Sequence, residues 1–464
     1  MSSNLTTVDT SEAITELAAL LPGQVVAPDH PNWADLSSGW VLSVDQRPRA
    51  VVTVTDEEDV VATVRCAARH GLSVSAQPVG HGATKALDGT VLVRTRALDA
   101  ISVAPERRIA RVGAGVKWGE LLAATEPHGL TGLAGSSPDP SVVGFMLGGG
   151  LSWFSRAHGL AAHSIVAVEL VDAQGALRRI TEASDPDLFW ALRGGGGDFG
   201  IVTAMEIALH PATHVYGGRL LWPIEMARPV LTAFQRVAAT APDELTLWAH
   251  LFRFPPLPEI PEPLRGGAFV SVDTTYLGSQ EEAESLLGPL RSLPALWMDS
   301  LGTVPLSQLG GIAAEPVDPM PTMELSGLLR DFDEVAIDRL LQVVGGERSP
   351  LPVVQVRHLG GALTRATADD GPAAAIDEPF QLFCLGVPVA PGVADAVDAT
   401  FAAVGEALSE HLTGRQAFNF LGDSDDPAQA LSGTALTRLR AVKEQVDPHG
   451  TIRSNRPVSA RAGD

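Results

Sequence analysis

Cysteine is scarce in this sequence of 464 residues, which contains only Cys66 and Cys384. Two thiols so far apart give no support for a disulfide framework, a cysteine-ligated zinc site or an iron–sulfur cluster. We therefore expect no metal centre, and the lack of a disulfide pattern favours a reducing, cytoplasmic location. Tyrosine is equally scarce, with Tyr216 and Tyr276 alone, so few phenol groups are available as a catalytic base.

Positive charge and long apolar runs are also limited. The 33 Lys and Arg residues are outnumbered by 55 Asp and Glu residues, which gives a formal net charge of −22. Such a charge repels nucleic acid phosphates and anionic lipid headgroups. No apolar run reaches the length of a membrane helix, and residues 1–23 lack the basic start of an export signal. We expect a globular protein without nucleic acid or membrane partners, and its oligomeric state is left open.

The residue pattern in the first half of the chain predicts a domain with both helices and strands. Residues 50–54 predict a strand, residues 56–70 a helix behind a capping box, and residues 72–76 a second strand that runs into a glycine loop. The remaining elements predicted here are strands near 91–94, 101–103, 109–112, 165–171 and 201–209 and helices near 117–127 and 185–193.

The second half differs because glycine becomes less frequent after residue 215. Residues 244–254 and 268–276 predict strands, and residues 280–293 predict a helix. We read residues 215–412 as a separate antiparallel sheet covered by helices. A helix at 436–445, followed by a stop signal at 447–450, is predicted for the tail.

Three glycine-rich segments, at residues 78–83, 135–160 and 194–200, are candidates for binding a nucleotide cofactor. The third matches the G-x-G-x-x-G pattern, but a helix precedes it and a strand follows, which is the reverse of the order in a Rossmann fold. In the first, backbone N–H groups of a glycine turn can form a nest for phosphate oxygens. His81 lies there between Gly80 and Gly82, where an imidazole nucleophile could meet a bound cofactor.

These segments resemble the covalent flavoproteins of the vanillyl-alcohol oxidase superfamily, in the berberine-bridge-enzyme-like branch with a PCMH-type FAD domain. The resemblance rests on Gly80-His81-Gly82 and on residues 143–150, 158–160, 168–175, 187–200, 418–420, 438–448 and Asn455. It implies an α+β fold: a two-part PCMH-type FAD-binding domain with an inserted antiparallel-sheet substrate domain covered by helices. The parts would be residues 1–212, 213–412 and 413–464.

The resemblance also implies FAD as the cofactor, attached covalently through His81 alone. Relatives with a second attachment use a cysteine where this chain has Ser137. Where many oxidases have Val and many dehydrogenases Leu, this chain has Pro140, so oxidase and dehydrogenase activity are both open. The residues expected at the cofactor are Val79, Gly80, Gly82, Ala83, Ser137, Asp139, Ser141, Val142, Val143, Gly144, Gly148, Gly149, Gly159, Leu160, Gly200, Val202 and Asn455.

The activity that the resemblance implies is oxidation of a small organic substrate, such as an alcohol, an amine or alkaloid, or a sugar. A hydride would pass to flavin N5, and O₂ or another acceptor would reoxidise the flavin. Alternatives are an oxidative cyclase or tailoring enzyme of secondary metabolism, and a flavin-binding protein without turnover.

The sequence leaves the identity of the catalytic base open. The tyrosine that many relatives use is replaced by Ala417, and the strand position where others carry a carboxylate falls at Gln355 and Arg357. His358 is a candidate base, although a structural histidine of the sheet is an alternative. Substrate-pocket candidates are Trp248, His250, Gln355 and Arg357, and Phe252 is expected to share the face of Trp248 and His250.

Overall fold

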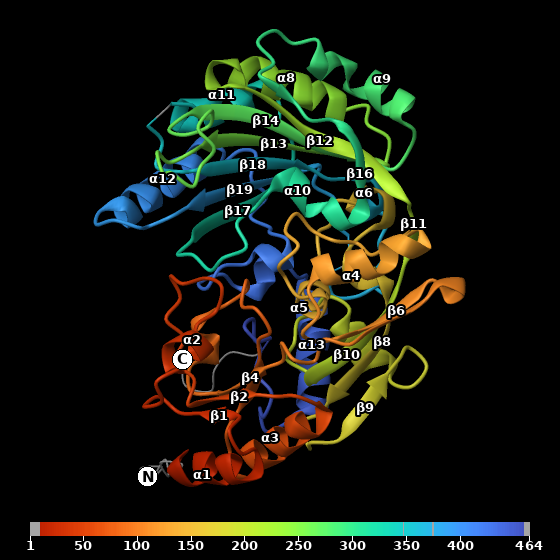
Figure 1. Ribbon diagram of the computed structural model, residues 1–464, viewed down its shortest axis with the longest axis vertical. Helices are drawn as coiled ribbons and strands as arrows, with labels where there is room; N and C mark the ends of the chain where they lie inside the picture. The colour runs from red at the N-terminus through yellow and green to blue at the C-terminus, as the bar shows by residue number, and fades with distance from the viewer. Residues whose placement is uncertain (1–9, 347, 374, 459–464) are drawn as a thin grey trace.

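The structure is a computed structural model that describes residues 10–346, 348–373 and 375–458. Figure 1 shows a large sheet under a layer of helices at one end of the molecule, and smaller sheets with their own helices at the other. None of the helices within the described ranges is long and apolar enough to cross a membrane.

The first 210 residues contain two main sheets. The first has the order β1-β2-β4-β3, and the second has the order β5-β6-β10-β8-β9. In the first, β2 and β3 pair in parallel with β4. In the second, all neighbours are antiparallel. The strands are β1 (Val25–Val26), β2 (Ala50–Thr53), β3 (Val74–Ala76), β4 (Val91–Arg94), β5 (Ile101–Ala104), β6 (Ile109–Gly113), β8 (Ile165–Val171), β9 (Leu177–Ile180) and β10 (Ile201–Ala208).

The helices of this part are shorter. They are α1 (Thr10–Leu20), α2 (Trp33–Ser37), α3 (Glu57–Arg69), α4 (Trp118–Thr125), α5 (Val142–Leu147), α6 (Ser155–His158) and α7 (Pro186–Leu192). Asp185 caps α7, because its carboxylate accepts a hydrogen bond from the Leu188 N–H. Two further short strands, β7 (Leu130–Thr131) and β11 (His210–Pro211), pair with each other.

The middle of the chain forms the large antiparallel sheet that the sequence predicted. Its order is β15-β12-β14-β13-β18-β19-β17, and β16 also pairs with β12. The strands are β12 (His214–Pro223), β13 (Leu245–Arg253), β14 (Ala268–Tyr276), β15 (Met298–Asp299), β16 (Gly302–Pro305), β17 (Met323–Leu329), β18 (Val353–His358) and β19 (Phe380–Gly386).

Strand alternation divides this sheet into a helix-covered face and an opposite face. The helices α8 (Ala227–Ala238), α9 (Gln280–Arg291), α11 (Glu334–Val344) and α12 (Val393–Ala407) lie over one face (Figure 1). Leu247, Ala249, Val272 and Val356 pack there in a single apolar cluster. The other face, which we call the polar face, looks toward the N-terminal part of the chain (Figure 1). A short helix, α10 (Gly310–Ala313), lies near its β12 edge.

The end of the chain returns to the N-terminal sheets. Helix α13 (Gly433–Val446) begins three residues before the predicted start, because the Ser432 hydroxyl accepts a hydrogen bond from the Ala435 N–H. After it, Ile452 pairs in parallel with Val74 at the edge of the first sheet. The two ends of the chain thus share one structural unit, while the exact boundaries at residues 212 and 412 remain predictions.

A buried lysine fixes this return. The Lys443 ammonium group donates to the Asp198 carbonyl oxygen at 2.6 Å, to the Ile452 carbonyl oxygen at 2.6 Å and to the Asp447 carboxylate at 2.7 Å. The Asp198 carboxylate in turn accepts from the backbone N–H groups of Ser454 and Val458, each at 2.8 Å. All three protons of the ammonium group are therefore used, and residues 452–458 are held against the glycine-rich segment at 194–200.

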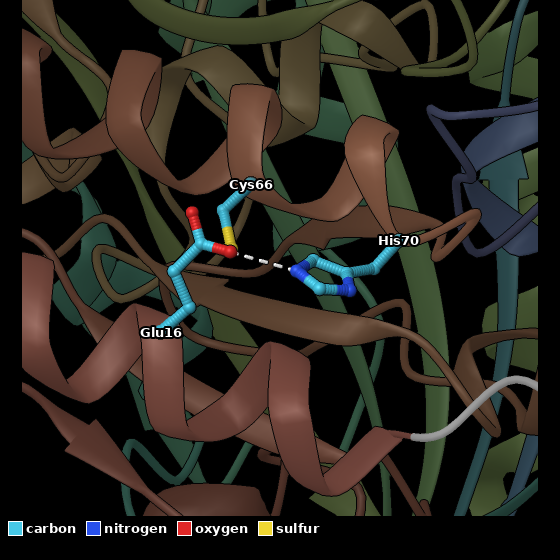
Figure 2. A group of neighbouring side chains, drawn as sticks. All are labelled: Glu16, Cys66 and His70. Carbon is cyan, nitrogen blue, oxygen red and sulfur yellow. Dashed lines mark hydrogen bonds and ion pairs between the residues drawn. The ribbon is translucent and has the colours of Figure 1, made fainter.

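Helices α1 and α3 are joined by an ionic cluster drawn in part in Figure 2. The Glu16 carboxylate pairs with Arg69 and lies 2.7 Å from His70 Nε2. The Cys66 thiol lies beside this pair, and burial raises its pKa. Since Arg69 already balances the charge of Glu16, we read the cluster as a tie between two helices.

The lysine network generates a test of the fold. Replacing Lys443 with Met leaves the buried Asp447 carboxylate without its cation, so we expect the free energy of unfolding to fall by about 3 kcal/mol. Urea unfolding would measure this difference. Gln445→Met, on an exposed position of the same helix, is the matched control and should change stability by less than about 0.5 kcal/mol. Equal stability of the two variants would contradict the role given to Lys443.

Candidate cofactor and substrate site

His81 lies in the loop that follows β3, at the end of a strand of the first sheet. Its Nε2 atom is 2.9 Å from the Asp139 carboxylate, and its ring stacks on Trp40 with 4.5 Å between centroids. Within the described residues, the other ring nitrogen, Nδ1, has no hydrogen-bond partner. Since Asp139 accepts from Nε2–H, the lone pair of a neutral ring is on Nδ1.

Asp139 is a buried carboxylate that interacts with two hydrogen-bond donors, one of which is a cation. Besides His81, it pairs with the Lys117 ammonium group. Burial of the carboxyl opposes ionisation, but the hydrogen bonds from His81 and Lys117 outweigh it, so the pKa of Asp139 lies below its ordinary value. The carboxylate thus stays ionised at neutral pH and fixes the orientation of the His81 ring.

The loop around His81 has features that fit an anionic cofactor. Gly80 adopts φ +102°, and a Cβ atom there would lie 2.6 Å from Gly39 Cα, so only glycine permits this close approach. Among the described residues, the backbone N–H groups of Gly80, His81 and Gly82 donate no hydrogen bond. Gly82 is exposed, and no atom lies within 4 Å of the position of its missing Cβ. Free N–H donors on an open glycine turn are what a phosphate or flavin edge requires.

Asn455 joins this loop from the far end of the chain. Its side-chain oxygen accepts from the Thr84 N–H at 3.1 Å and lies 3.4 Å from the Gln46 amide nitrogen. Its backbone oxygen accepts from the Thr84 hydroxyl at 2.7 Å. The prediction that Asn455 lies at the cofactor stays a prediction, but the structure brings it to the His81 loop.

The second glycine-rich segment surrounds α5. The Ser141 hydroxyl caps this helix by accepting from the Gly144 N–H at 3.2 Å, and Gly144 is exposed. Beyond the helix, Asn419 accepts from the Gly150 N–H at 2.5 Å and donates to the Phe145 carbonyl at 3.1 Å.

Gly148 must be glycine, because a Cβ atom would lie 2.4 Å from the Asn419 amide nitrogen. Gly148, Gly149, Leu160 and Asn419 line a small hollow of about 20 Å³. The adjacent Gly159 has φ +82°. In the sequence, Asn419 belongs to the segment 418–420 that carries the family resemblance, but no role was predicted for it.

Several other predicted cofactor residues are buried in the protein interior. Gly200 packs against Leu170, to which a Cβ atom would come within 2.8 Å, and Val202 is 5% exposed. The third glycine-rich segment binds the end of the chain through Asp198. Ser137 accepts a hydrogen bond from the Asp139 N–H at 3.3 Å. The remaining buried members of the predicted set are Ala83, Val142 and Val143, whereas Val79 is half-buried.

The predicted substrate residues meet on the polar face of the large sheet. Trp248 is paired with Arg357, and His250 with Gln355, across β13 and β18. Directly opposed residues of antiparallel strands share one face. Trp248 stacks on Trp153 with 3.5 Å between centroids. His250 stacks on Phe252 at 4.9 Å, which agrees with the predicted alternation.

His250 is a neutral part of this face. Burial lowers the pKa of His250 to about 4, although Asp273 opposes the shift. The Gln355 amide contacts its Nε2 atom, and its Nδ1 atom is 3.4 Å from the Ser271 hydroxyl. The ring is therefore uncharged at neutral pH and held on both sides.

His358 does not share the polar face, because it follows Arg357 directly in the strand. Its Nε2 atom lies 3.0 Å from the Arg156 guanidinium, which donates to it. Burial, with Arg156 as a second cause, lowers the pKa of His358 to about 3. With this lone pair engaged, the surroundings of His358 do not favour the role of base that the sequence suggested.

The polar face contains residues that the sequence reasoning missed. Glu324 and Ser326 on β17 are opposed to Leu385 and Phe383 on β19, and Gln381 donates to the Ser326 hydroxyl at 3.1 Å. Glu324 is open to solvent, yet protein surrounds it on most sides, and the resulting desolvation raises the pKa of its carboxyl. The polar residues at positions 324 and 326 alternate with apolar ones, and this pattern could have predicted a strand with one polar face here.

Two residues connect the glycine-rich segments to the polar face. Phe420 follows Asn419, and its ring centroid is 5.0 Å from the Arg357 guanidinium carbon. Trp153, three residues after Gly150, stacks on Trp248. The cofactor candidates and the substrate candidates therefore border one region.

Comparisons with known proteins agree with this arrangement. Residues 48–181 match the sequence profile of a family described as an FAD binding domain. The chain is 28% identical over 309 residues to (R)-6-hydroxynicotine oxidase of Paenarthrobacter nicotinovorans. That alignment covers 64% of this chain and 64% of the relative, slightly less than two thirds of its length.

Solved structures have the same fold. The crystal structure of 6-hydroxy-D-nicotine oxidase from Arthrobacter nicotinovorans matches with a TM-score of 0.79 at 22% identity, over 93% of this chain and 96% of that one. Physcomitrella patens BBE-like 1 matches with a TM-score of 0.82 at 19% identity, over 97% and 100% of the two chains. The chain therefore carries an FAD-binding domain, is similar in sequence to (R)-6-hydroxynicotine oxidase, and has the fold of 6-hydroxy-D-nicotine oxidase and the BBE-like protein.

Proposed function

We propose that this protein is an FAD-dependent oxidoreductase that oxidises a small organic substrate at a carbon bearing an OH or NH group. The observation that carries the proposal is the continuity between two sets of residues. Asn419 binds the glycine segment at Gly150, and the next residue, Phe420, lies against Arg357 on the polar face. A cofactor held by the glycine segments would thus border the substrate candidates.

When bound, FAD supplies the acceptor for the hydride, and O₂ or another oxidant restores it. The chain itself supplies position and environment. The glycine turns admit the cofactor backbone, Asn419 and Asn455 fix the segments around it, and the polar face orients the substrate. The aromatic residues Trp153, Trp248 and Phe420 exclude water from this region.

His81 is the proposed point of covalent attachment. Asp139 holds Nε2–H, so Nδ1 is the ring atom with a free lone pair and is the atom that would bond to the flavin 8α carbon. The 8α methyl group would lose one C–H hydrogen as a proton, the flavin itself would take up the two electrons, and O₂ or another acceptor would reoxidise it. The single linkage follows from Ser137, since a hydroxyl cannot form the thioether that a cysteine could. Asp139 acts as a positioning residue for this bond.

The covalent link is tested by acid precipitation of the purified yellow protein. We expect the flavin to stay in the pellet of the wild type and to be released from His81→Ala. Asp139→Asn should slow covalent incorporation by about a hundredfold, the size expected when a reacting group is no longer held in the right orientation. Ser137→Ala is the matched control, with unchanged incorporation. Release of flavin from the wild type would show that attachment is not covalent.

The role of the glycine turn is tested by Gly82→Val. Because no atom lies near the missing Cβ, the side chain fits the protein, but it would project into the space assigned to the cofactor. We expect stability without flavin to change by less than about 1 kcal/mol and flavin content to fall severalfold. Gly302→Val, at another position with open space, should keep full flavin content. A fully loaded Gly82→Val protein would place the cofactor elsewhere.

Glu324 is the proposed proton acceptor on the polar face. No ion pair is recorded for it among the described residues. A carboxyl with a raised pKa is closer to the operating pH and so is a better general base. Because the base must be ionised, kcat/KM should increase as pH rises through the raised pKa of this group.

Anaerobic bleaching of the flavin tests the activity. A substrate should reduce the flavin of the wild type rapidly, and Glu324→Gln should slow this step by about a hundredfold with unchanged flavin content. Glu259→Gln, which removes an exposed carboxylate between β13 and β14, is the control. A flavin that no candidate substrate reduces would favour a binding protein without turnover, and a cyclised product would favour the cyclase alternative.

A further inference from the structure

Arg357 is buried at the centre of the polar face, with 5% of its surface exposed. Its guanidinium packs against two aromatic rings, with its central carbon 4.1 Å from the Trp248 centroid and 5.0 Å from the Phe420 centroid. The N–H groups at the edge of the guanidinium are the part that can form hydrogen bonds.

One part of that edge is fixed by the protein. Arg357 Nε donates to the Gln355 side-chain oxygen at 2.5 Å, and the Gln355 amide is in turn held by His250. This chain of contacts fixes the direction of the guanidinium. Within the described residues no acceptor is recorded for the two Nη groups, and no carboxylate lies at ion-pair distance from Arg357.

Other buried arginines of this protein are satisfied differently. Arg94, Arg156, Arg253 and Arg456 are also buried enough to lower their pKa to about 10. Arg94, Arg253 and Arg456 each donate to three backbone carbonyl oxygens, and Arg156 donates to four. Arg357, whose pKa is likewise lowered to about 10 by burial, has one acceptor.

The buried carboxylate of Asp273, on the same face, is not available to Arg357. Asp273, fully buried, forms a two-point ion pair with Arg219, with both distances at 2.6 Å. The charge of Glu315 raises the pKa of Arg357 against the effect of burial, but Glu315 forms no ion pair with it among the described residues. Arg357 therefore remains ionised at neutral pH without a directly bound counterion. A buried charge with unfilled donors is costly unless a ligand completes it.

We propose that the Nη edge of Arg357 binds a carboxylate group of the substrate, so that the substrate is a small organic acid oxidised at another of its carbons. The planar, two-pronged geometry of a guanidinium edge matches the two oxygens of a carboxylate. The stacked rings and Gln355 hold this edge in place before the ligand arrives. The inference rests on the proposed function, since it concerns the substrate of the same site.

The test compares benzoate with benzamide, which has the same shape without the charge. Binding of each to the flavin-loaded protein is measured by isothermal titration calorimetry. We expect benzoate to bind at least about tenfold more tightly, as expected for a charge-assisted pair. Arg357→Gln should abolish the preference, and Arg357→Lys should retain part of it.

A second variant keeps the size of the side chains unchanged. Gln355→Glu places a carboxylate at the position that already contacts Arg357 Nε, and this internal counterion should also abolish the preference for benzoate. If Arg357→Gln does not fold, this variant decides the question. Equal affinities in the wild type, no binding of benzoate, or a preference that survives in both Arg357→Gln and Gln355→Glu would overturn the proposal.

Flavin content, measured on the same samples, separates this inference from the proposed function. A protein without flavin would contradict the proposed function, whereas the calorimetric preference does not depend on a spectroscopic signal from the cofactor. A loaded protein that treats benzoate and benzamide alike would contradict only the carboxylate assignment.

Discussion

The buried ammonium group of Lys443 joins the two ends of the chain. Its three protons bind Asp198, Asp447 and Ile452, and Asp198 then holds the backbone of residues 454 and 458. Asn455 lies in this segment and binds Thr84, three residues beyond His81. The shape of the His81 loop therefore depends on a charge buried on the opposite side of the same segment. A lysine serves here because its three donors are satisfied in an enclosed site, where any unpaired proton would be costly.

The large sheet shows a different constraint, the separation of two surfaces by strand alternation. One face is apolar and receives the helices, so it provides the hydrophobic stabilisation of this part of the chain. This leaves the other face free to carry Arg219, Asp273, His250, Gln355 and Arg357, whose polar atoms mainly contact each other. Such buried polar groups are tolerated where each finds a partner, which makes the incompletely partnered Arg357 stand out.

Aromatic stacking connects the two constraints. Trp153 comes from the N-terminal part and Phe420 from the C-terminal part, yet both rings meet the polar face at neighbouring positions. The polar face is thus held against the glycine segments by two separate stretches of chain. This arrangement explains why a glycine is needed at position 148: Asn419, which precedes Phe420, approaches its backbone too closely for a side chain. At Gly150 the side chains of Phe145 and Ala161 leave no room for a Cβ atom.

Much of the fold and the class of cofactor could be predicted from the sequence. The spacing of apolar residues and the helix-capping residues predicted the bounds of β14 and, within a few residues, those of most other predicted elements. These patterns succeed because they are local properties of the chain. The glycine motifs around His81 indicated FAD, which the family match at residues 48–181 supports. The pairing of the N-terminal strands could not be predicted: they form two sheets, because strand partners distant in sequence are chosen by the packing of the whole unit.

The sequence by itself determined which side chains share a face of a strand, as for Trp248, His250 and Phe252, because alternation is fixed by the backbone. Only the tertiary structure decided what each side chain meets. In the tertiary structure, the Asp139 carboxylate accepts a hydrogen bond from His81, and the Arg156 guanidinium donates one to His358. Arg357 has a single hydrogen-bond acceptor among the described residues, the side-chain oxygen of Gln355. These contacts join residues between 2 and 202 positions apart in the chain, and their electrostatic consequences follow from burial and distance, which no local pattern encodes.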